Sequence, residues 1–306
     1  MRPILFHYAS GGLSHFLSLL GNSLTFAKEA RWRLAVVSEY HQPLGTLPLD
    51  DIFELREPLV PFREISKRKR PVEAEHLRPV RFLDQTQGRM ALVRSQNKDQ
   101  YFSGYLPAFE HRGGFGFSTG DWAPGADRNK KAPDLDSRLT SVKHLALRGQ
   151  FREAVIERRN LLREPYIGVH FRNTDYTNDI QETITQLVAK VEATGFRDVY
   201  WCTDDASSVD RVRTALPDVN LLWNQPFDNS GKNLHYGIRG KDSIKHLKNT
   251  FADLYTLFAS RDFIPSQRSG WKRFVGILRD EREVAEHFFG LDSTPGIQRE
   301  QPLQRT

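Results

Sequence analysis

The residues best suited to chemistry in this 306-residue chain follow the apolar runs of its second half. Tyr166 to Phe171 is typical of a buried strand. Side chains alternate between the two faces of a strand, so His170 and Arg172 share one face. A guanidinium there suits a phosphate oxygen, because it donates two parallel hydrogen bonds and keeps its charge. The pattern predicts an anion-binding face, and the alternative is a surface ion pair between Arg172 and Asp175.

Two further polar segments follow apolar runs. Thr203-Asp204-Asp205 stands before a predicted helix that begins near Ser207, where acidic side chains also act as caps and dipole partners. Residues 265–271 are mostly small and polar and open another helix. Exposed amide groups and the positive helix end make this segment a candidate anion site, although Ser269 is equally explained as the helix cap.

These segments require strands that end at one edge of a sheet. The strands are expected at 166–171, 199–202, 219–223 and 263–264, and the helices at 180–191, 207–216, 244–260 and 270–278. Asp179 and Glu182 have the spacing of a capping box at the start of the first helix. The alternation favours an α/β fold with a parallel doubly wound sheet, in which ligands bind at the carboxyl ends of the strands.

The first half begins with a βαβ unit and then becomes hard to interpret. A strand at 4–6, the pair Gly11-Gly12, a helix at 13–30 and a strand at 34–37 make up this unit. Prolines punctuate the stretch 42–145, whose strands the sequence does not place.

Composition is that of an ordinary globular protein, with 39% hydrophobic and 27% charged residues. No apolar run approaches the ~20 residues of a membrane-spanning helix, so no membrane span is expected. Cys202 is the single cysteine, which excludes an internal disulfide and a Cys/His structural zinc site. The net charge of +6 favours an anionic partner such as a sugar nucleotide or a nucleic acid. No recognition helix or aromatic-basic strand motif supports a nucleic acid, so none is predicted.

Taken in order, the polar segments of the second half resemble the three motifs of the fucosyltransferase superfamily. This superfamily includes α-1,6-fucosyltransferases, nodulation fucosyltransferases and protein O-fucosyltransferases. The matching segments are His170-x-Arg172 with Asp175, Thr203-Asp204-Asp205, and Ala252-Asp253-Leu254 followed by 266–271. The N-terminal segment 11–15 and its helix are similar to the glycine-rich loop and helix that open the protein O-fucosyltransferases.

The resemblance implies two Rossmann-like domains that face each other across a cleft, the GT-B arrangement. We expect an acceptor-side domain at 1–150, a GDP-sugar-binding domain at 151–291 and a disordered tail at 292–306. The implied activity is metal-independent, inverting transfer of fucose from GDP-fucose to a hydroxyl of a glycan or protein, with no cofactor. The chain carries no apparent anchor or disulfide, which fits a bacterial-type cytoplasmic enzyme.

The resemblance also assigns roles to residues. His170 and Asp253 are expected at the guanine, since a carboxylate accepts from its N1 and N2 donors; the alternative for Asp253 is a solvent-facing helix residue. Arg172 is the expected catalytic residue, which binds the β-phosphate and stabilises the departing GDP. The other implied site residues are Asp175, Asp204, Ser266, Ser269 and Gly270 for the donor, and Gly11, Gly12, Ser14 and His15 in the N-terminal loop.

The chain departs from the family pattern at two points and leaves alternatives open. Asn173 replaces the second arginine of the α-1,6 branch, and Ser14-His15 stand where the O-fucosyltransferases have Gly-Asn. No metal site is predicted, since the adjacent pairs Asp50-Asp51 and Asp204-Asp205 alternate in direction. The alternatives are a transferase for another nucleotide sugar, an inactive nucleotide-binding protein and a nucleic-acid-binding protein.

Overall fold

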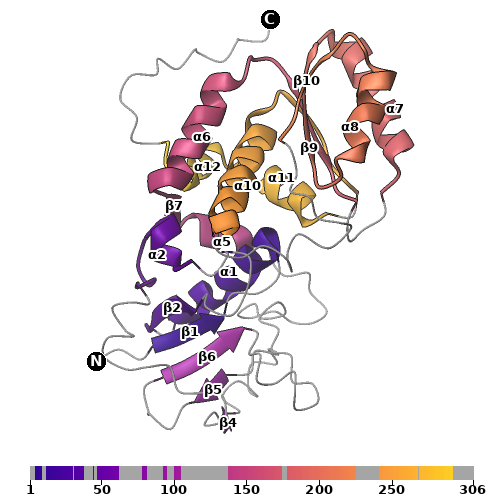
Figure 1. The fold of residues 1–306 in the computed structure, drawn as a ribbon. Helices are drawn as coiled ribbons and strands as arrows, with labels where there is room; N and C mark the ends of the chain where they lie inside the picture. Colours follow the sequence, from indigo (N-terminus) through magenta and orange to yellow (C-terminus); the bar gives the residue numbers. More distant parts are fainter. Residues whose placement is uncertain are drawn as a thin grey trace, which may run out of the picture.

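The computed structural model is a mixed α/β protein (Figure 1). It describes residues 4–8, 12–29, 31–37, 44, 47–61, 78–80, 92–94, 100–104, 137–173, 178–224, 241–267 and 269–291. In these residues the strands form a five-stranded, a four-stranded and a two-stranded sheet. The predicted tail at 292–306 lies outside the described residues.

The four-stranded sheet has the order β10-β9-β8-β11, and all its neighbouring strands are parallel. The strands are β8 (Ile167–Phe171), β9 (Asp198–Thr203), β10 (Asn220–Leu222) and β11 (Asp262–Ile264). All five residues of β8 are buried, as expected for an inner strand covered on both faces. The prediction of a parallel sheet with these strands is confirmed.

Helices cover both faces of this sheet. Figure 1 shows α7 (Ile180–Thr194) and α8 (Ser207–Ala215) on one face and α10 (Lys241–Ala259) on the other. Val169, Phe171 and Trp201 share a core cluster with side chains of α7 and α8, whereas Tyr200 and Cys202 share the second cluster with α10. Strand alternation therefore assigns the even-numbered residues, including the predicted site residue His170, to the α10 face.

The helices were predicted where their apolar spacing is regular. Asp179 caps α7 as predicted, because its carboxylate accepts from the backbone N–H groups of Gln181 and Glu182. After β11 comes α11 (Gly270–Asp280), also predicted. Two helices were not predicted, α6 (Gly149–Leu161) and α12 (Arg282–Phe288). In α6 only Phe151 and Val155 are buried, so its apolar periodicity is weak.

The N-terminal sheet has the order β2-β1-β6-β5-β4. Its first unit is the predicted one: β1 (Ile4–Tyr8), α1 (Leu13–Glu29) and β2 (Arg33–Val37), with the two strands parallel. The other strands lie in the stretch that the sequence left unplaced, and they are β4 (Arg78–Val80), β5 (Leu92–Arg94) and β6 (Gln100–Gly104). β6 is parallel to β1, while β5 is antiparallel to β4 and β6.

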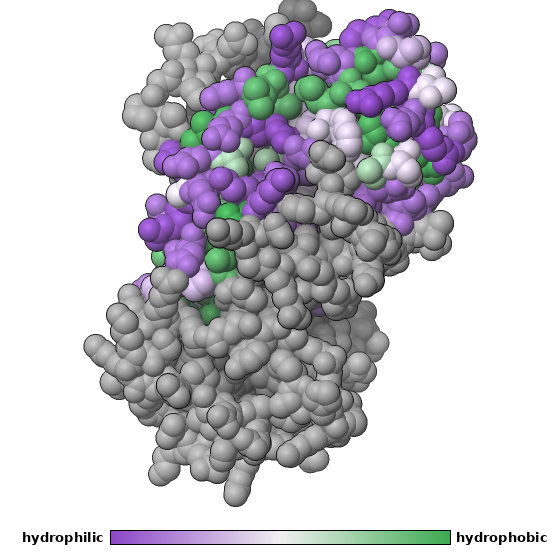
Figure 2. Space-filling model, in the orientation of Figure 1, coloured by the Kyte–Doolittle hydropathy of each residue, from purple (hydrophilic) through white to green (hydrophobic). Residues whose placement is uncertain are grey.

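Short elements join the two larger sheets. They are α2 (Leu49–Ile52), β3 (Phe53–Leu55), α5 (Ser137–Val142) and β7 (Leu145–Leu147), of which β3 and β7 pair antiparallel. One core cluster runs from Leu13 to Phe289 and contains side chains of α1, α5, α6, α10 and α12. The domain boundary expected at residue 150 falls inside α6, and that division stays a prediction. Figure 2 shows mainly hydrophilic side chains on the described surface of this face, with scattered apolar ones, as in ordinary solvated proteins.

Candidate functional site

His170 lies near the end of β8 and packs against α11. Its side chain is 6% exposed, and its ring stacks on Trp271 of α11 with 5.3 Å between centroids and 13° between planes. Burial, and secondarily the charge of Arg172, lower the pKa of His170 from 6.5 to about 3, so the imidazole is neutral near pH 7. Among the described residues, nothing hydrogen-bonds to its buried Nδ1. This nitrogen can therefore form a hydrogen bond with a ligand or a water molecule.

Ser266 ties the loop after β11 to the end of β8. Its hydroxyl donates to the carbonyl oxygen of His170 at 2.8 Å and accepts from the backbone N–H of Arg172, also at 2.8 Å. The backbone from which the Arg172 side chain departs is therefore fixed at the carboxyl edge of the sheet. Three of the predicted site residues are thus brought together.

Asp204 and Asp205 accept hydrogen bonds from neighbouring segments of the protein. Asp204 Oδ1 accepts from the backbone N–H of Asn173 at 2.7 Å. Asp205 accepts from the N–H and the hydroxyl of Ser207, the first residue of α8, at 3.0 and 2.6 Å, and so holds the start of that helix. Its second oxygen accepts from the Asn173 side-chain amide at 2.9 Å. Asn173, which stands in place of an arginine, therefore anchors the segment after β8 to the end of β9.

The N-terminal ends of α1 and α11 meet beside this edge. Ser269 caps α11, since its hydroxyl accepts from the N–H of Trp271 at 3.2 Å. Ser14, in the first turn of α1, donates to the carbonyl oxygen of Gly270 at 3.1 Å. Arg138 of α5 donates through Nε to the hydroxyl of Ser14 at 2.9 Å and to its carbonyl oxygen at 3.1 Å. Two positive helix ends and a guanidinium thus come close together.

The remaining residues of the N-terminal loop are partly described. The carbonyl oxygen of Gly12 accepts from the N–H of Phe16 at 2.9 Å in the first turn of α1. His15 is exposed, whereas Ser14 is buried. Gly11 and Asp175 lie outside the described residues.

Asp253 lies on α10 with its carboxylate against β9. Oδ1 accepts from the Tyr200 hydroxyl at 2.6 Å and from the Asn224 amide, while Oδ2 accepts from the Cys202 thiol at 3.5 Å. The side chain is 15% exposed, so the solvent-facing alternative for Asp253 is wrong. Burial raises the pKa of Asp253, and the nearby Arg158 and the three donors counteract this in part. Each of these groups donates to the carboxylate, so the contacts fit its ionised form.

Arg158 of α6 is the partner of Asp253 that sequence reasoning missed. Its guanidinium lies 3.5 Å from Asp253 Oδ1, and only 14% of its side chain is exposed. It also donates to the Tyr200 hydroxyl and to the Asn224 side-chain oxygen. No local pattern identifies this pair, because 95 residues separate its members and α6 itself was not predicted.

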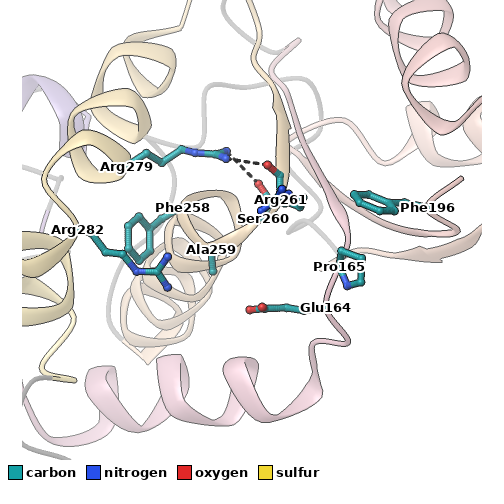
Figure 3. Close-up of a pocket in the computed structure, with 9 residues that line it drawn as sticks. All are labelled: Glu164, Pro165, Phe196, Phe258, Ala259, Ser260, Arg261, Arg279 and Arg282. Carbon is teal, nitrogen blue, oxygen red and sulfur yellow. Dashed lines mark hydrogen bonds between the residues drawn. The ribbon is translucent and has the colours of Figure 1, made fainter. Parts of the chain in front are cut away.

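A pocket of about 610 Å³ lies at the opposite, amino edge of the four-stranded sheet (Figure 3). It is lined by Glu164, Pro165, Phe196, Phe258, Ala259, Ser260, Arg261, Arg279 and Arg282. Arg279 donates to the Ser260 hydroxyl at 3.4 Å and to the Arg261 carbonyl oxygen at 3.0 Å, and Arg282 donates to Glu286 at 3.2 Å. Two of its cations therefore have partners within the protein, and none of the predicted site residues lines it.

Two properties of the described part of the chain concern metal binding and membranes. There, His, Cys, Asp and Glu side chains form no group of three or more that is arranged to hold a metal ion. No helix among the same residues combines the length and the apolar character needed to cross a membrane.

The comparisons with known proteins rest on structure. Neither a protein-family model nor a curated protein sequence matches the chain. Solved structures do match, and each match below covers 91% of this chain. A NodZ α-1,6-fucosyltransferase soaked with GDP-fucose has 17% identity and a TM-score of 0.56 over 93% of its length. Fucosyltransferase NodZ from Bradyrhizobium has 16% identity and 0.54 over 94%, and POFUT1 in complex with GDP has 14% identity and 0.54 over 95%.

These matches confirm the predicted resemblance at the level of the fold. They extend over nearly the whole chain. The chain therefore has the α/β fold of the fucosyltransferases NodZ and POFUT1.

Proposed function

We propose that this protein is an inverting glycosyltransferase that moves fucose from GDP-fucose to a hydroxyl group of a glycan or protein without a metal ion. The observation that carries the proposal is the convergence, at one edge of the parallel sheet, of the β8 end with the N-terminal ends of α1 and α11. Ligands of parallel α/β sheets bind at this edge. The fold is shared with fucosyltransferases whose structures hold GDP or GDP-fucose, so a guanine nucleotide is the first donor to test.

The guanine base is proposed to lie against His170 and Asp253. His170 has a buried ring nitrogen to which no described residue bonds, and Oδ2 of Asp253 has only a thiol contact at 3.5 Å among the described residues. Guanine presents both acceptors and an amino donor at its edges, and a neutral imidazole and an ionised carboxylate complement such a pattern. Guanine also places two donors side by side, N1–H and N2–H2, toward a carboxylate. Adenine has an acceptor at N1, and uracil has a single N3–H donor between two carbonyl oxygens, so neither presents that pair.

The diphosphate is proposed to lie between Arg172 and the start of α11. The amide groups behind Ser269 and Gly270 and the positive end of that helix suit phosphate oxygens. When the acceptor hydroxyl attacks the sugar carbon and gives up its proton to water, the bond to the β-phosphate oxygen breaks and negative charge grows on the departing GDP. The Arg172 guanidinium donates to that oxygen and stabilises the charge, while attack from the opposite side inverts the configuration.

The acceptor is proposed to enter between the two sheets in a GT-B arrangement. In this arrangement residues 1–150 face the acceptor and residues 151–291 hold the donor, with Ser14 at the point where the two halves touch. We also propose that this is a bacterial-type enzyme that works in the cytoplasm, in keeping with its single cysteine, which leaves no internal disulfide to form.

A nucleotide panel tests the proposal directly. Thermal unfolding is measured in EDTA with GDP, GDP-fucose, UDP, CDP and ADP, because a ligand that binds the native state raises the melting temperature. We expect GDP and GDP-fucose alone to stabilise the protein. Equal shifts with UDP would overturn the guanine assignment, and a strict need for manganese in a transfer assay would overturn the metal-free mechanism.

A further inference from the structure

The two oxygens of the Asp253 carboxylate have unequal surroundings. Oδ1 receives the Tyr200 hydroxyl at 2.6 Å, the Asn224 amide and the Arg158 guanidinium at 3.5 Å. Oδ2 receives only the Cys202 thiol, at 3.5 Å, among the described residues. A thiol at this distance is a weak donor. One oxygen is therefore held by the protein, and the other keeps accepting capacity for a ligand.

Arg158 organises the donors that hold Oδ1. It donates to the hydroxyl of Tyr200 and to the side-chain oxygen of Asn224, which directs the Asn224 amide group toward Asp253. Its guanidinium carbon also lies 4.8 Å from the centroid of the Tyr200 ring, within range of a cation–π contact. Two of the other donors to Asp253 thus depend on this one arginine for their orientation.

Asp253 Oδ2 is connected to His170 through Cys202, which lies beside His170 in the sheet. His170 pairs with Cys202 in the register of β8 and β9, and the Cys202 thiol contacts Oδ2 of Asp253. His170 and Cys202 lie on the same face of the sheet, because paired residues of neighbouring strands point the same way. Nδ1 of His170 is buried without a bond from any described residue. Two complementary groups are thus available in one region at the carboxyl edge.

We propose that Arg158 is a positioning residue for nucleobase recognition: it keeps Asp253 ionised and fixes Oδ1, so that Oδ2 alone accepts from the base. This inference rests on the proposed function, since the base is that of the guanine nucleotide. A carboxylate removed from water is costly unless a counter-ion and hydrogen bonds compensate for the lost hydration, and Arg158 provides both. The nucleotide then meets a charged acceptor that is already oriented before binding.

The proposal predicts a pH dependence with a defined sign. Burial raises the pKa of Asp253, and Arg158 lowers it. Removing Arg158 raises that pKa further, so the carboxylate becomes protonated at a higher pH. Below that pH the affinity for GDP falls. The other titratable groups in contact with the carboxylate are Tyr200 and Cys202, whose pKa values burial raises well above their ordinary values, so both stay protonated. Nearby, His170 stays neutral because its pKa is about 3.

The experiment compares Arg158→Met and Arg158→Lys with Arg159→Met, a matched control on the same helix whose side chain contacts neither Asp253 nor Tyr200 in any described interaction. GDP affinity is measured by calorimetry between about pH 5 and about pH 8, which lies above the ordinary aspartate pKa of about 4, so that a raised pKa of Asp253 becomes visible. We expect Arg158→Met to lose about 10-fold or more in GDP affinity near neutral pH, and more at lower pH. Arg158→Lys keeps the charge and should lose several-fold with the pH profile of the unmodified protein. If the methionine variant does not fold, the lysine variant carries the test.

A second readout separates this inference from the proposed function. The Asp253 carboxyl resonance, assigned with Asp253→Asn, is titrated by isotope-edited NMR, and its midpoint should rise in Arg158→Met but not in Arg159→Met. GDP affinities and pH profiles equal to those of the control would overturn the positioning role. If the unmodified protein binds no GDP, the proposed function and the role in base recognition both fall. The NMR titration then still decides whether Arg158 keeps Asp253 ionised, and an unchanged midpoint would overturn that part as well.

Discussion

The hydroxyl of Ser14 donates to the carbonyl oxygen of Gly270 at 3.1 Å across 256 residues of sequence. This bond joins the first turn of α1 to the first residue of α11, so the two helices meet at their N-terminal ends. A side chain at residue 270 would intrude on this contact, because an added Cβ would come within 3.1 Å of the Ser14 hydroxyl. The meeting of the two helices thus requires a small residue at 270.

Replacing Ser14 by alanine is expected to lower the free energy of unfolding by about 1 to 2 kcal/mol, the range for a hydrogen bond whose partner stays partly buried. The change removes the bond to Gly270 and one of the two acceptors of Arg138 Nε. Thr25→Ala, also on α1, loses a bond only to the helix's own Gly21 carbonyl and serves as the control. Urea unfolding measures both variants. Equal effects would mean that the α1–α11 contact adds nothing to stability.

Replacing Asp253 by asparagine is expected to weaken GDP binding and also to destabilise the fold. From the sequence alone, only a binding loss of about 1.5 to 3 kcal/mol is expected. The structure adds a loss of stability. Asparagine leaves the buried Arg158 without its counter-ion and places amide hydrogens near groups, such as the Tyr200 hydroxyl, that donate to Asp253. Losing one partner of a buried pair costs about 3 to 5 kcal/mol.

Asp262→Asn is the matched control for this change. Asp262 pairs with Lys190 at 3.0 Å, but the two side chains are 27% and 40% exposed. Solvent screens such a pair, so its loss should cost less than about 1 kcal/mol. Denaturant unfolding at one pH measures both variants. A stability loss for Asp253→Asn no greater than that of the control would contradict the buried ion pair.

Asp253 was named as a site residue from the sequence, whereas its partner Arg158 was not. The strands β8 and β9 were predicted because their runs are continuously apolar, as the burial of Ile167 to Phe171 requires. Polar residues at their ends could then be located by the rule that ligands bind at carboxyl edges. Arg158 lies instead on a helix with only two buried apolar residues, so nothing local marks it.

The middle of the chain was unpredictable for a different physical reason. β4, β5 and β3 have three residues each, too short for an alternating pattern to stand out from loops. Their place depends on pairing with distant strands, such as β3 with β7 across 90 or so residues of sequence. The contact of Ser14 with Gly270 also joins distant parts of the sequence, so the residue spacing within either segment does not predict it.

Acidification is expected to destabilise the fold through His170. The folded-state pKa is about 3 and the ordinary value 6.5, so between them the unfolded chain binds a proton that the folded chain does not. The free energy of unfolding therefore falls as the pH drops below 6.5, by up to about 1.4 kcal/mol per pH unit for one such group. His7, whose pKa burial also lowers to about 3, acts in the same direction.

His170→Gln removes one of these titrations and should make the pH dependence shallower. Urea unfolding of both proteins is measured from about pH 7 down to about pH 4, the interval over which the unfolded histidine gains its proton. The difference between the two proteins should be constant above about pH 7, where neither state is protonated, and shrink below it. Parallel curves over the whole range would show that His170 gains its proton equally in both states.

Arg172 is expected to act on the transition state more than on the bound ground state. Ser266 fixes the backbone of Arg172 at the end of β8, so the guanidinium side chain starts from a rigid position beside the proposed diphosphate site. Charge on the departing GDP grows as the sugar bond breaks, and a two-pronged donor gains most at that point. Arg172→Ala should therefore lower turnover by about 100-fold or more, while GDP affinity changes far less.

Arg172→Lys decides between a directed guanidinium and a diffuse positive charge. Lysine keeps the charge but cannot donate two parallel hydrogen bonds, so the turnover of Arg172→Lys should be nearly as low as that of Arg172→Ala. Arg261→Ala, an exposed arginine at the amino edge of the same sheet, removes a charge without touching the site and should leave turnover unchanged. Turnover and GDP affinity are measured on all three variants. Near-normal turnover in the lysine variant would reduce Arg172 to a nonspecific charge, and near-normal turnover in the alanine variant would remove it from the mechanism.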